Sequence, residues 1–349
     1  MEDLVPLPPQ PAGVPWPTED WPAGDPPTGV DVEGLLDEVF AGGVFGKTYA
    51  VVVVQGGRLL TERYANELDH WDRPAETVTR DTQLLSWSMA KSFTHALVGV
   101  LVRESRLDVE APANVPAWRD DERSAITLDH LLCMRDGLDF AEDYVDAGVS
   151  DVIEMLFGEG KDDVLAYAES RPLRATPGER FNYSSGTSNI VSGIVGREIG
   201  FGDDFDRFMK SRLLEPIGIR NARLGFDAAG TFIGSSYLYM PAREFAKFGL
   251  LYLRGGTWDG TEIVPRAWVD HGRRPRSVDE SDGRIHGAHW WVVGDDLGTW
   301  WASGYDGQSI LLCPALDLLV VRLGWSPDAG AADALFQWRR RVVAAFSAS

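Results

Sequence analysis

The chain has 349 residues, of which 44% are hydrophobic and 11% aromatic, so it is long enough for one large domain or two closely packed ones. Its formal net charge of -20 argues against nucleic acid or an anionic membrane surface as a partner. No stretch reaches the roughly 18 uninterrupted apolar residues of a membrane-spanning helix, and the first residues lack the pattern of a secretory signal. Because Cys133 and Cys313 lie far apart in apolar surroundings, we expect free thiols and a cytoplasmic protein.

The N-terminal part of the chain predicts an extended arm, a helix and a hairpin. Residues 1–30 contain nine of the 20 prolines and show little periodicity, which is typical of an arm lying on the surface. Apolar residues at helical spacing predict a helix over 31–40. A run of β-branched residues predicts a strand over 48–54, and the glycine turn after it predicts a hairpin with a second strand over 58–64.

From residue 88 to about residue 240 the pattern is mostly helical, with long irregular connections. A buried helix is expected to begin at Ser88, because apolar residues follow helical spacing from there almost to Arg103. Shorter helices are expected from Thr127 to an end at Gly137, over roughly 149–158 and 161–170, and from about Ser184 through Val195.

The C-terminal part returns to strands and ends in a helix. We expect a helix after Pro241 that ends at Gly255-Gly256, strands over 289–293, 309–313 and 318–323, and a closing helix over 331–346. Together the elements predict an α+β fold, in which an antiparallel sheet built from both termini is flanked by helices and carries an inserted, mostly helical domain. The expected division is an arm at 1–30, a sheet domain from 31–86 and 241–349, and a helical domain at 87–240, with the active site between the two domains.

The stretch Ser88-Met89-Ala90-Lys91 suggests nucleophilic chemistry. Residues three apart lie on one face of a helix, so Ser88 and Lys91 are neighbours. A hydroxyl at a helix N-terminus lies beside free N–H groups, and a lysine one turn into an apolar helix is partly desolvated, which lowers its pKa and lets it accept a proton. Serine is also a common helix N-cap, so this pattern by itself leaves catalytic and structural interpretations open.

Five further stretches follow the first motif in a characteristic order. The second motif is Phe181-Asn182-Tyr183-Ser184-Ser185 after Pro177-Gly178, and the third is Gly304-Tyr305-Asp306-Gly307-Gln308-Ser309. Three satellites run from Leu131 to Leu138, from Leu214 to Gly218, and from Phe248 to Trp258. In this order they resemble the serine β-lactamase and penicillin-binding-protein superfamily over roughly residues 45–349. The likeness is to the class C-like esterase branch, which includes the 6-aminohexanoate-dimer hydrolases.

This resemblance implies a serine hydrolase that cleaves carboxylic esters or short linear amides through an acyl-enzyme on Ser88. Lys91 and Tyr183 would share the proton-accepting role, and the sequence leaves open which of the two is the general base. Tyr183 would then protonate the leaving group. The backbone N–H groups of Ser88 and Gln308 would form the oxyanion hole.

By the same resemblance, the substrate would contact Tyr144, Ser185, Tyr305, Asp306 and Gly307. Ser185 stands where the family often has asparagine. Tyr305 stands where β-lactamases place a cationic residue, which favours an esterase over a β-lactamase. Tyr144 is either a contact from a loop closing over the substrate or an ordinary surface tyrosine.

Several alternatives stay open at this point. The chain could instead be a β-lactamase or D-amino-acid peptidase, or a non-catalytic member of the fold acting as a binding module. The tryptophans could line an acyl pocket or belong to the core; they are Trp87, Trp290, Trp291, Trp300 and Trp301. We expect no cofactor and no metal, since no His/Cys cluster has ligand spacing and His286 and His289 form an isolated pair. The expected partner is a small-molecule ester or amide, and the expected assembly is a monomer or homodimer.

Overall fold

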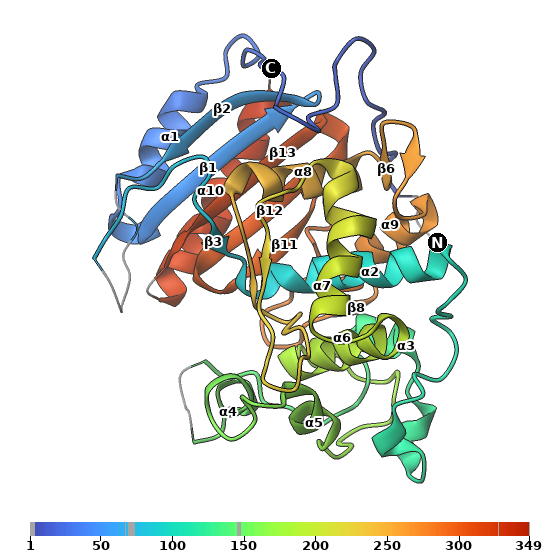
Figure 1. Ribbon diagram of the computed structural model, residues 1–349. Coiled ribbons are helices and arrows are strands. Elements are labelled where there is room, and N and C mark those ends of the chain that lie inside the picture. Colours follow the sequence, from blue (N-terminus) through green and yellow to red (C-terminus); the bar gives the residue numbers. More distant parts are fainter. Residues whose placement is uncertain (1–3, 67, 69–73, 145–147, 327, 349) are drawn as a thin grey trace.

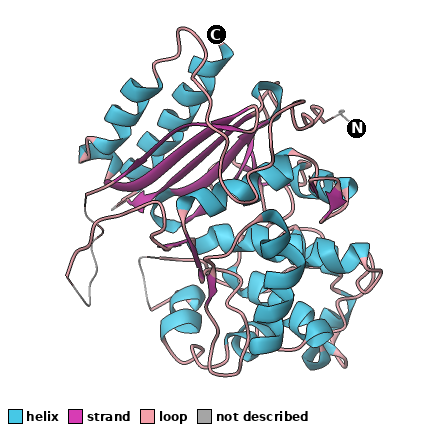
Figure 2. Cartoon of the chain, turned by 45° about the horizontal axis from the view of Figure 1, so that its top comes forward, coloured by secondary structure: helices cyan, strands magenta, loops and turns pink. Residues whose placement is uncertain are grey.

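An antiparallel sheet organises the fold, as the computed structural model shows for residues 4–66, 68, 74–144, 148–326 and 328–348 (Figures 1 and 2). Within these residues the strand order is β2-β1-β13-β12-β11-β10-β9-β8, and all neighbours are antiparallel. The strands are β1 (Lys47–Gln55), β2 (Arg58–Tyr64), β8 (Ser277–Val278), β9 (Ile285–His286), β10 (Trp291–Val292), β11 (Trp300–Gly304), β12 (Gln308–Cys313) and β13 (Leu318–Trp325). Strands from the N-terminal part and from the C-terminal part of the chain thus share one sheet, which confirms the predicted α+β class.

Strand β1 is buried on both faces. Ala50, Val52 and Val54 belong to one core cluster, whereas Val51 and Val53 belong to the cluster on the opposite face. β-branched side chains pack well on a pleated surface, and here both surfaces are covered. This explains why the sequence shows a continuous apolar run instead of alternation.

Two helices from the ends of the chain cover one face of the sheet (Figure 1). They are α1 (Val32–Phe40) and α10 (Ala329–Ser347). Each begins at an aspartate whose side chain accepts a hydrogen bond from the first turn, Asp31 for α1 and Asp328 for α10. Such caps satisfy N–H groups that have no intrahelical partner, so they determine where the helices start.

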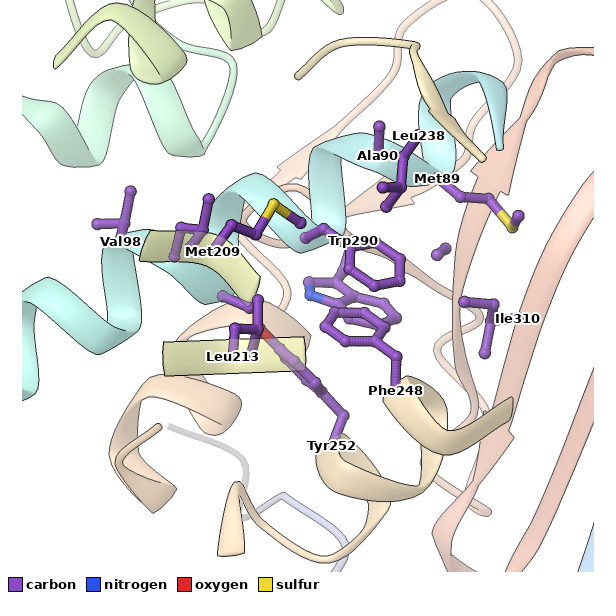
Figure 3. Close-up of a cluster of buried hydrophobic side chains, with 14 of the residues drawn as sticks. Met89, Ala90, Val98, Met209, Leu213, Leu238, Phe248, Tyr252, Trp290 and Ile310 are labelled. Atoms are coloured by element: carbon purple, nitrogen blue, oxygen red, sulfur yellow. The ribbon is translucent and has the colours of Figure 1, made fainter. Parts of the chain in front are cut away.

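The other face supports the helix that carries the first motif, α2 (Ala90–Arg103). Figure 3 shows Met89 and Ala90 at its start, above a cluster that includes Phe248 and Trp290. Phe93 of α2 stacks on Phe248 of α8 (Ala242–Leu253), with ring centroids 3.6 Å apart. Close packing of this kind fixes the position of a helix, so the start of α2 is held against the sheet.

The remaining α-helices and strands of the described residues lie between residues 84 and 273. They are α3 (Leu128–Leu132), α4 (Asp151–Phe157), α5 (Val164–Glu169), α6 (Ser185–Ile199), α7 (Asp203–Met209), α9 (Arg266–Arg273), β3 (Leu84–Leu85), β4 (Arg223–Leu224), β5 (Leu238–Met240), β6 (Thr257–Trp258) and β7 (Thr261–Glu262). Strands β3, β5 and β4 form a small sheet, and β6 pairs with β7. The division into domains at residues 86 and 240 stays a prediction.

The sequence missed some elements and misjudged one. It did not predict β11, whose residues include no β-branched side chain, nor the short helices α7 and α9. The strand predicted over 289–293 is shorter, with only Trp291 and Val292 paired, because His289 has a φ of 56° and cannot continue a ladder.

The N-terminal arm is attached to the core. Its described part, residues 4–30, contains no helix or strand, but Leu7 and Trp21 are buried in the main core cluster. Ala23 also forms an isolated bridge to Leu59 of β2. The described part of the arm is thus anchored to the core through two apolar side chains. Among the described residues, no helix combines the length and apolar character needed to cross a membrane.

Candidate active site

Ser88 lies where the chain turns into α2. A single 3₁₀ turn, Trp87–Met89, leads directly into the helix, and Trp87 has a positive φ of 43°. Such a backbone is costly for a bulky residue and persists only when its surroundings hold it. The result places Ser88, half-buried, in the turn that leads into α2.

Lys91 is buried directly beside Ser88. Its Nζ donates to Ser88 Oγ at 3.0 Å, to Ser185 Oγ at 3.0 Å and to the Ser235 carbonyl at 3.1 Å. All three ammonium protons therefore have acceptors. Burial lowers the pKa of Lys91 to about 8, and the negative charge of Glu142 acts in the opposite direction. A lysine with this pKa can exchange a proton near neutral pH.

Tyr183 completes the set that the sequence grouped with Ser88. Its ring centroid lies 4.9 Å from Lys91 Nζ, and its ring stacks on Trp291 with centroids 5.4 Å apart. Its hydroxyl interacts with the Ser88 side chain. Burial raises the pKa of Tyr183 above its ordinary value, and the charge of Glu142 adds to this. The structure thus brings Ser88, Lys91 and Tyr183 together, although 92 residues of chain separate Lys91 from Tyr183.

The loop before α4 brings two more side chains to the same point. Tyr144 donates from its hydroxyl to Glu142 Oε1 at 2.5 Å. Ser185 donates to the same carboxylate from its N–H at 2.7 Å and from its Oγ at 2.6 Å. Although 43% of Tyr144 is exposed, its hydroxyl also interacts with Ser88. Burial and the charge of Glu142 raise the pKa of the Tyr144 hydroxyl.

The C-terminal end of β11 lies against the start of α2. A Cβ at Gly304 would lie 2.3 Å from the Ser86 carbonyl oxygen, so only glycine lets this strand approach the start of α2. The next residue, Tyr305, places its ring 5.8 Å from that of Trp87 and 5.1 Å from that of Tyr144. We call Trp87, Tyr144 and Tyr305 the aromatic collar, because all three lie around Ser88.

Asp306 lies in the turn Tyr305–Gly307 that follows β11. Its φ is 61°, and its carboxylate interacts with the Trp87 side chain and the Ser326 backbone. Burial raises the pKa of Asp306 to about 6. Gly307, with a φ of 76°, lies against Leu335 of α10. The left-handed backbone brings the Asp306 carboxylate close to the Trp87 side chain, which belongs to the aromatic collar.

Gln308 is buried at the start of β12, and both its side chain and its N–H make hydrogen bonds within the sheet and the preceding turn. Its side-chain amide donates to the Gly324 carbonyl at 2.5 Å and accepts from the Gly324 N–H at 2.8 Å, which ties β12 to β13. Its own N–H donates to the Tyr305 carbonyl within the turn Tyr305–Gly307. An N–H in such a turn can be shared between two acceptors.

Sequence reasoning missed two residues of this site. Glu142 was not singled out from the sequence, and its position two residues before Tyr144 is the one available signal. Ser235 accepts a hydrogen bond from Lys91 through its backbone carbonyl. Because every residue has such a carbonyl, the sequence could not indicate this contact. Ser235 is held in place because its N–H donates to Asn189 Oδ1 of α6 at 3.1 Å.

The tryptophans divide between the two interpretations that the sequence left open. Trp290, Trp291, Trp300 and Trp301 are buried in the core clusters, whereas Trp87 is half-buried beside Ser88. Trp291 also stacks on Tyr183, so part of the core supports the site directly.

A cluster of potential metal ligands lies outside this site. It was not predicted, because its residues are not all close together in the sequence. Ligand atoms of Asp129, Cys133 and His271 lie within 4.8 Å of one another. These groups satisfy each other, since Asp129 Oδ1 lies 2.7 Å from His271 Nε2 and 3.5 Å from Cys133 Sγ. The chain of contacts continues through His95 to the Tyr252 hydroxyl. A hydrogen-bonded relay accounts for these residues without an ion.

Comparisons with known proteins agree with this geometry. The family model described as Beta-lactamase matches residues 36–341. A 6-aminohexanoate-dimer hydrolase from Paenarthrobacter ureafaciens is 27% identical over 318 residues, which cover 85% of this chain and 76% of that protein.

Two solved structures share the fold. One is a candidate 6-aminohexanoate-dimer hydrolase from Bacillus anthracis, with a TM-score of 0.75 and 20% identity over 93% of this chain and 87% of that one. The other is a family VIII carboxylesterase, with a TM-score of 0.67 and 16% identity over 90% of this chain and 99% of that one. At these identities the likeness extends to the fold alone. With the family model covering most of its length, the chain belongs to the beta-lactamase family of serine hydrolases.

Proposed function

We propose that this protein hydrolyses carboxylic esters or short linear amides through an acyl-enzyme on Ser88. The observation that carries the proposal is the 3.0 Å contact between Lys91 Nζ and Ser88 Oγ in a buried setting. A weak nucleophile such as a serine hydroxyl needs an adjacent base, and a lysine whose pKa is lowered by burial can serve as one.

The proposed reaction uses the side chains around Ser88 in turn. Ser88 Oγ attacks the carbonyl carbon and passes its proton to the coupled pair of Lys91 and Tyr183. The tetrahedral intermediate collapses as Tyr183 returns a proton to the leaving alcohol or amine. Water then attacks the acyl-enzyme along the same proton path and releases the carboxylic acid.

The developing oxyanion needs backbone donors. We propose the N–H of Ser88, in the first turn before α2, and the N–H of Gln308 at the start of β12. The Gln308 N–H would share its donation between the Tyr305 carbonyl and the substrate oxygen. Loss of one such donor typically lowers kcat by about 100- to 1000-fold.

The aromatic collar supports a neutral substrate. Tyr305 offers a neutral hydroxyl where the β-lactamases of the family have a cation, so Tyr305 cannot form an ion pair with a carboxylate beside the scissile bond. The Paenarthrobacter relative is named for a linear amide dimer, and one structural neighbour is a carboxylesterase. Both names agree with esters and linear amides as the substrate class.

We expect kcat/KM for p-nitrophenyl butyrate to exceed that for a chromogenic cephalosporin by at least about tenfold. A charge-assisted hydrogen bond to the cephalosporin carboxylate is worth roughly 1.5–3 kcal/mol, and Tyr305 cannot supply it. Initial rates with both substrates measure the ratio. Tyr305→Lys should narrow it by raising cephalosporin turnover, whereas Tyr305→Phe, which adds no charge, should not. A wild-type preference for the cephalosporin would support the β-lactamase alternative instead.

Removing the Tyr144 hydroxyl should affect amides more than esters. An amide has the poorer leaving group and depends more on exact placement beside Ser88, so we expect Tyr144→Phe to lower amide kcat/KM about five- to tenfold more than ester kcat/KM. Paired assays with a linear ω-amino amide and p-nitrophenyl butyrate give this ratio. If kcat/KM falls by the same factor for the amide and the ester, Tyr144 does not help to position the amide.

We also propose a reducing, cytoplasmic setting. Cys133 and Cys313 are both free and buried, which suits a compartment that keeps thiols reduced. The monomer or homodimer expected from the sequence stays a prediction, which sedimentation equilibrium would measure.

A further inference from the structure

We propose that Glu142 is a positioning residue of this site, holding Ser185 and Tyr144 against Ser88 and supplying the countercharge for Lys91. The inference rests on the proposed Ser88 hydrolase function, and it assigns a role to a side chain that the resemblance does not include.

The geometry of the carboxylate is the first argument. Oε1 accepts from the Tyr144 hydroxyl at 2.5 Å and from Ser185 Oγ at 2.6 Å, while Oε2 accepts from the Ser185 N–H at 2.7 Å. Ser185 Oγ in turn accepts from Lys91 Nζ at 3.0 Å. Hydrogen bonds to an ionised group are shorter and stronger than neutral ones. One carboxylate therefore connects the lysine, the loop tyrosine and the start of α6.

The loop that carries Glu142 is itself held on both sides. Before Glu142, Asn182 Nδ2 donates to the Phe140 carbonyl at 3.1 Å and the Ala141 N–H donates to Asp151 Oδ2 at 2.8 Å. After it, the Asp143 carbonyl accepts a hydrogen bond from the Ser150 hydroxyl. Glu142 also meets α6 at its N-terminus, where a free N–H and the helix dipole favour negative charge. The carboxylate is thus presented to Ser185 by the backbone on either side of it.

The electrostatic surroundings are the second argument. Among the described residues, Glu142 is the carboxylate whose charge acts on Lys91, and it acts on Tyr183 and Tyr144 as well. The other titratable neighbours are His286 and His289, which burial keeps neutral at ordinary pH, and Arg284, whose charge lowers the pKa of Tyr183.

The direction of the effect does not depend on which group is the base. A negative charge raises the pKa of Lys91, of Tyr183 and of Tyr144 alike, so its removal lowers the pKa of all three. The base must be deprotonated to accept the proton of Ser88, and this requirement produces the acid limb of the pH–rate profile. A lower pKa moves that limb to lower pH.

The test is the pH dependence of kcat/KM for p-nitrophenyl butyrate, after subtraction of spontaneous hydrolysis. We expect Glu142→Gln to move the acid limb down by about one pH unit or more and to lower the pH-independent kcat/KM, because the hydrogen bonds to Ser185 and Tyr144 weaken. Glu142→Asp keeps the charge and should return the limb toward the wild-type position. Glu159→Gln removes the same charge from an exposed position and is the matched control.

The outcomes are distinguishable. An unmoved acid limb in Glu142→Gln, or an equal shift in Glu159→Gln, overturns the inference while leaving the hydrolase function intact. A wild-type protein without esterase or amidase activity overturns the proposed function instead. If thermal melting shows that Glu142→Gln does not fold, Ser185→Ala takes its place, since it removes the hydroxyl between Lys91 and Glu142. The acid limb of the Ser185→Ala pH–rate profile should also move to lower pH. If that limb does not move, the inference is overturned in the same way.

Discussion

Ser88→Ala is expected to abolish both hydrolysis and covalent labelling by a fluorophosphonate. The alanine variant loses the only atom that we assign to bond formation with the substrate, so kcat should fall by at least about 10⁴-fold. Intact-protein mass spectrometry of the wild type should show a single adduct, and the variant should show none. Because the serine hydroxyl is small and half-buried, we expect the thermal midpoint of unfolding to change little.

Two results would contradict this assignment. An adduct that persists in Ser88→Ala would mean that another residue is the nucleophile. A wild-type protein that is neither labelled nor active would favour the non-catalytic alternative, a binding module with this fold. Ser281→Ala, which alters an exposed loop serine, is the control and should label like the wild type.

Lys91→Ala and Tyr183→Phe should each lower kcat by about 100- to 10,000-fold. Lys91 Nζ lies 3.0 Å from Ser88 Oγ, and the hydroxyl of Tyr183 interacts with the same serine, so both side chains act on one reacting group. Residues that act as a unit show strongly non-additive effects. The double variant should therefore be scarcely slower than the slower single variant.

Steady-state kinetics of the wild type, both single variants and the double variant complete this cycle. Tyr183→Phe keeps the ring that stacks on Trp291, so its loss should come from the hydroxyl alone. Thermal melting of each variant separates an effect on folding from one on catalysis. Losses that multiply in full would mean that Lys91 and Tyr183 do not share one proton path.

Local patterns predicted the long elements well. The β-branched run of β1 and the helical spacing of α2 appear in the structure close to their predicted ranges, because both are buried along their length. Short elements were harder. Strand β11 carries Trp300, Trp301 and a glycine in place of β-branched residues, and it is a strand because β12 pairs with it along its length. Its identity comes from its neighbour and not from its own propensity.

The candidate site shows the same division. The spacing of Ser88 and Lys91 is local, since three residues on a helix bring two side chains together wherever the helix lies. The motif order also allowed Tyr183 to be grouped with them by resemblance. The orientation of Asp306 could not be predicted, because it depends on a left-handed backbone and on the Trp87 side chain, 219 residues away in the chain.

The family, the α+β class and the three residues proposed for catalysis could be predicted from the sequence, because they depend on short motifs and on periodicity. The charge environment of those residues could not be predicted, because it depends on contacts between segments that are far apart in the chain. Glu142 meets Ser185 across 43 residues of chain, and the pKa of Lys91 depends on burial that α2 acquires only when it packs against α6 and the sheet. A pKa is set by desolvation and by nearby charges in space, and neither quantity exists until the chain has folded.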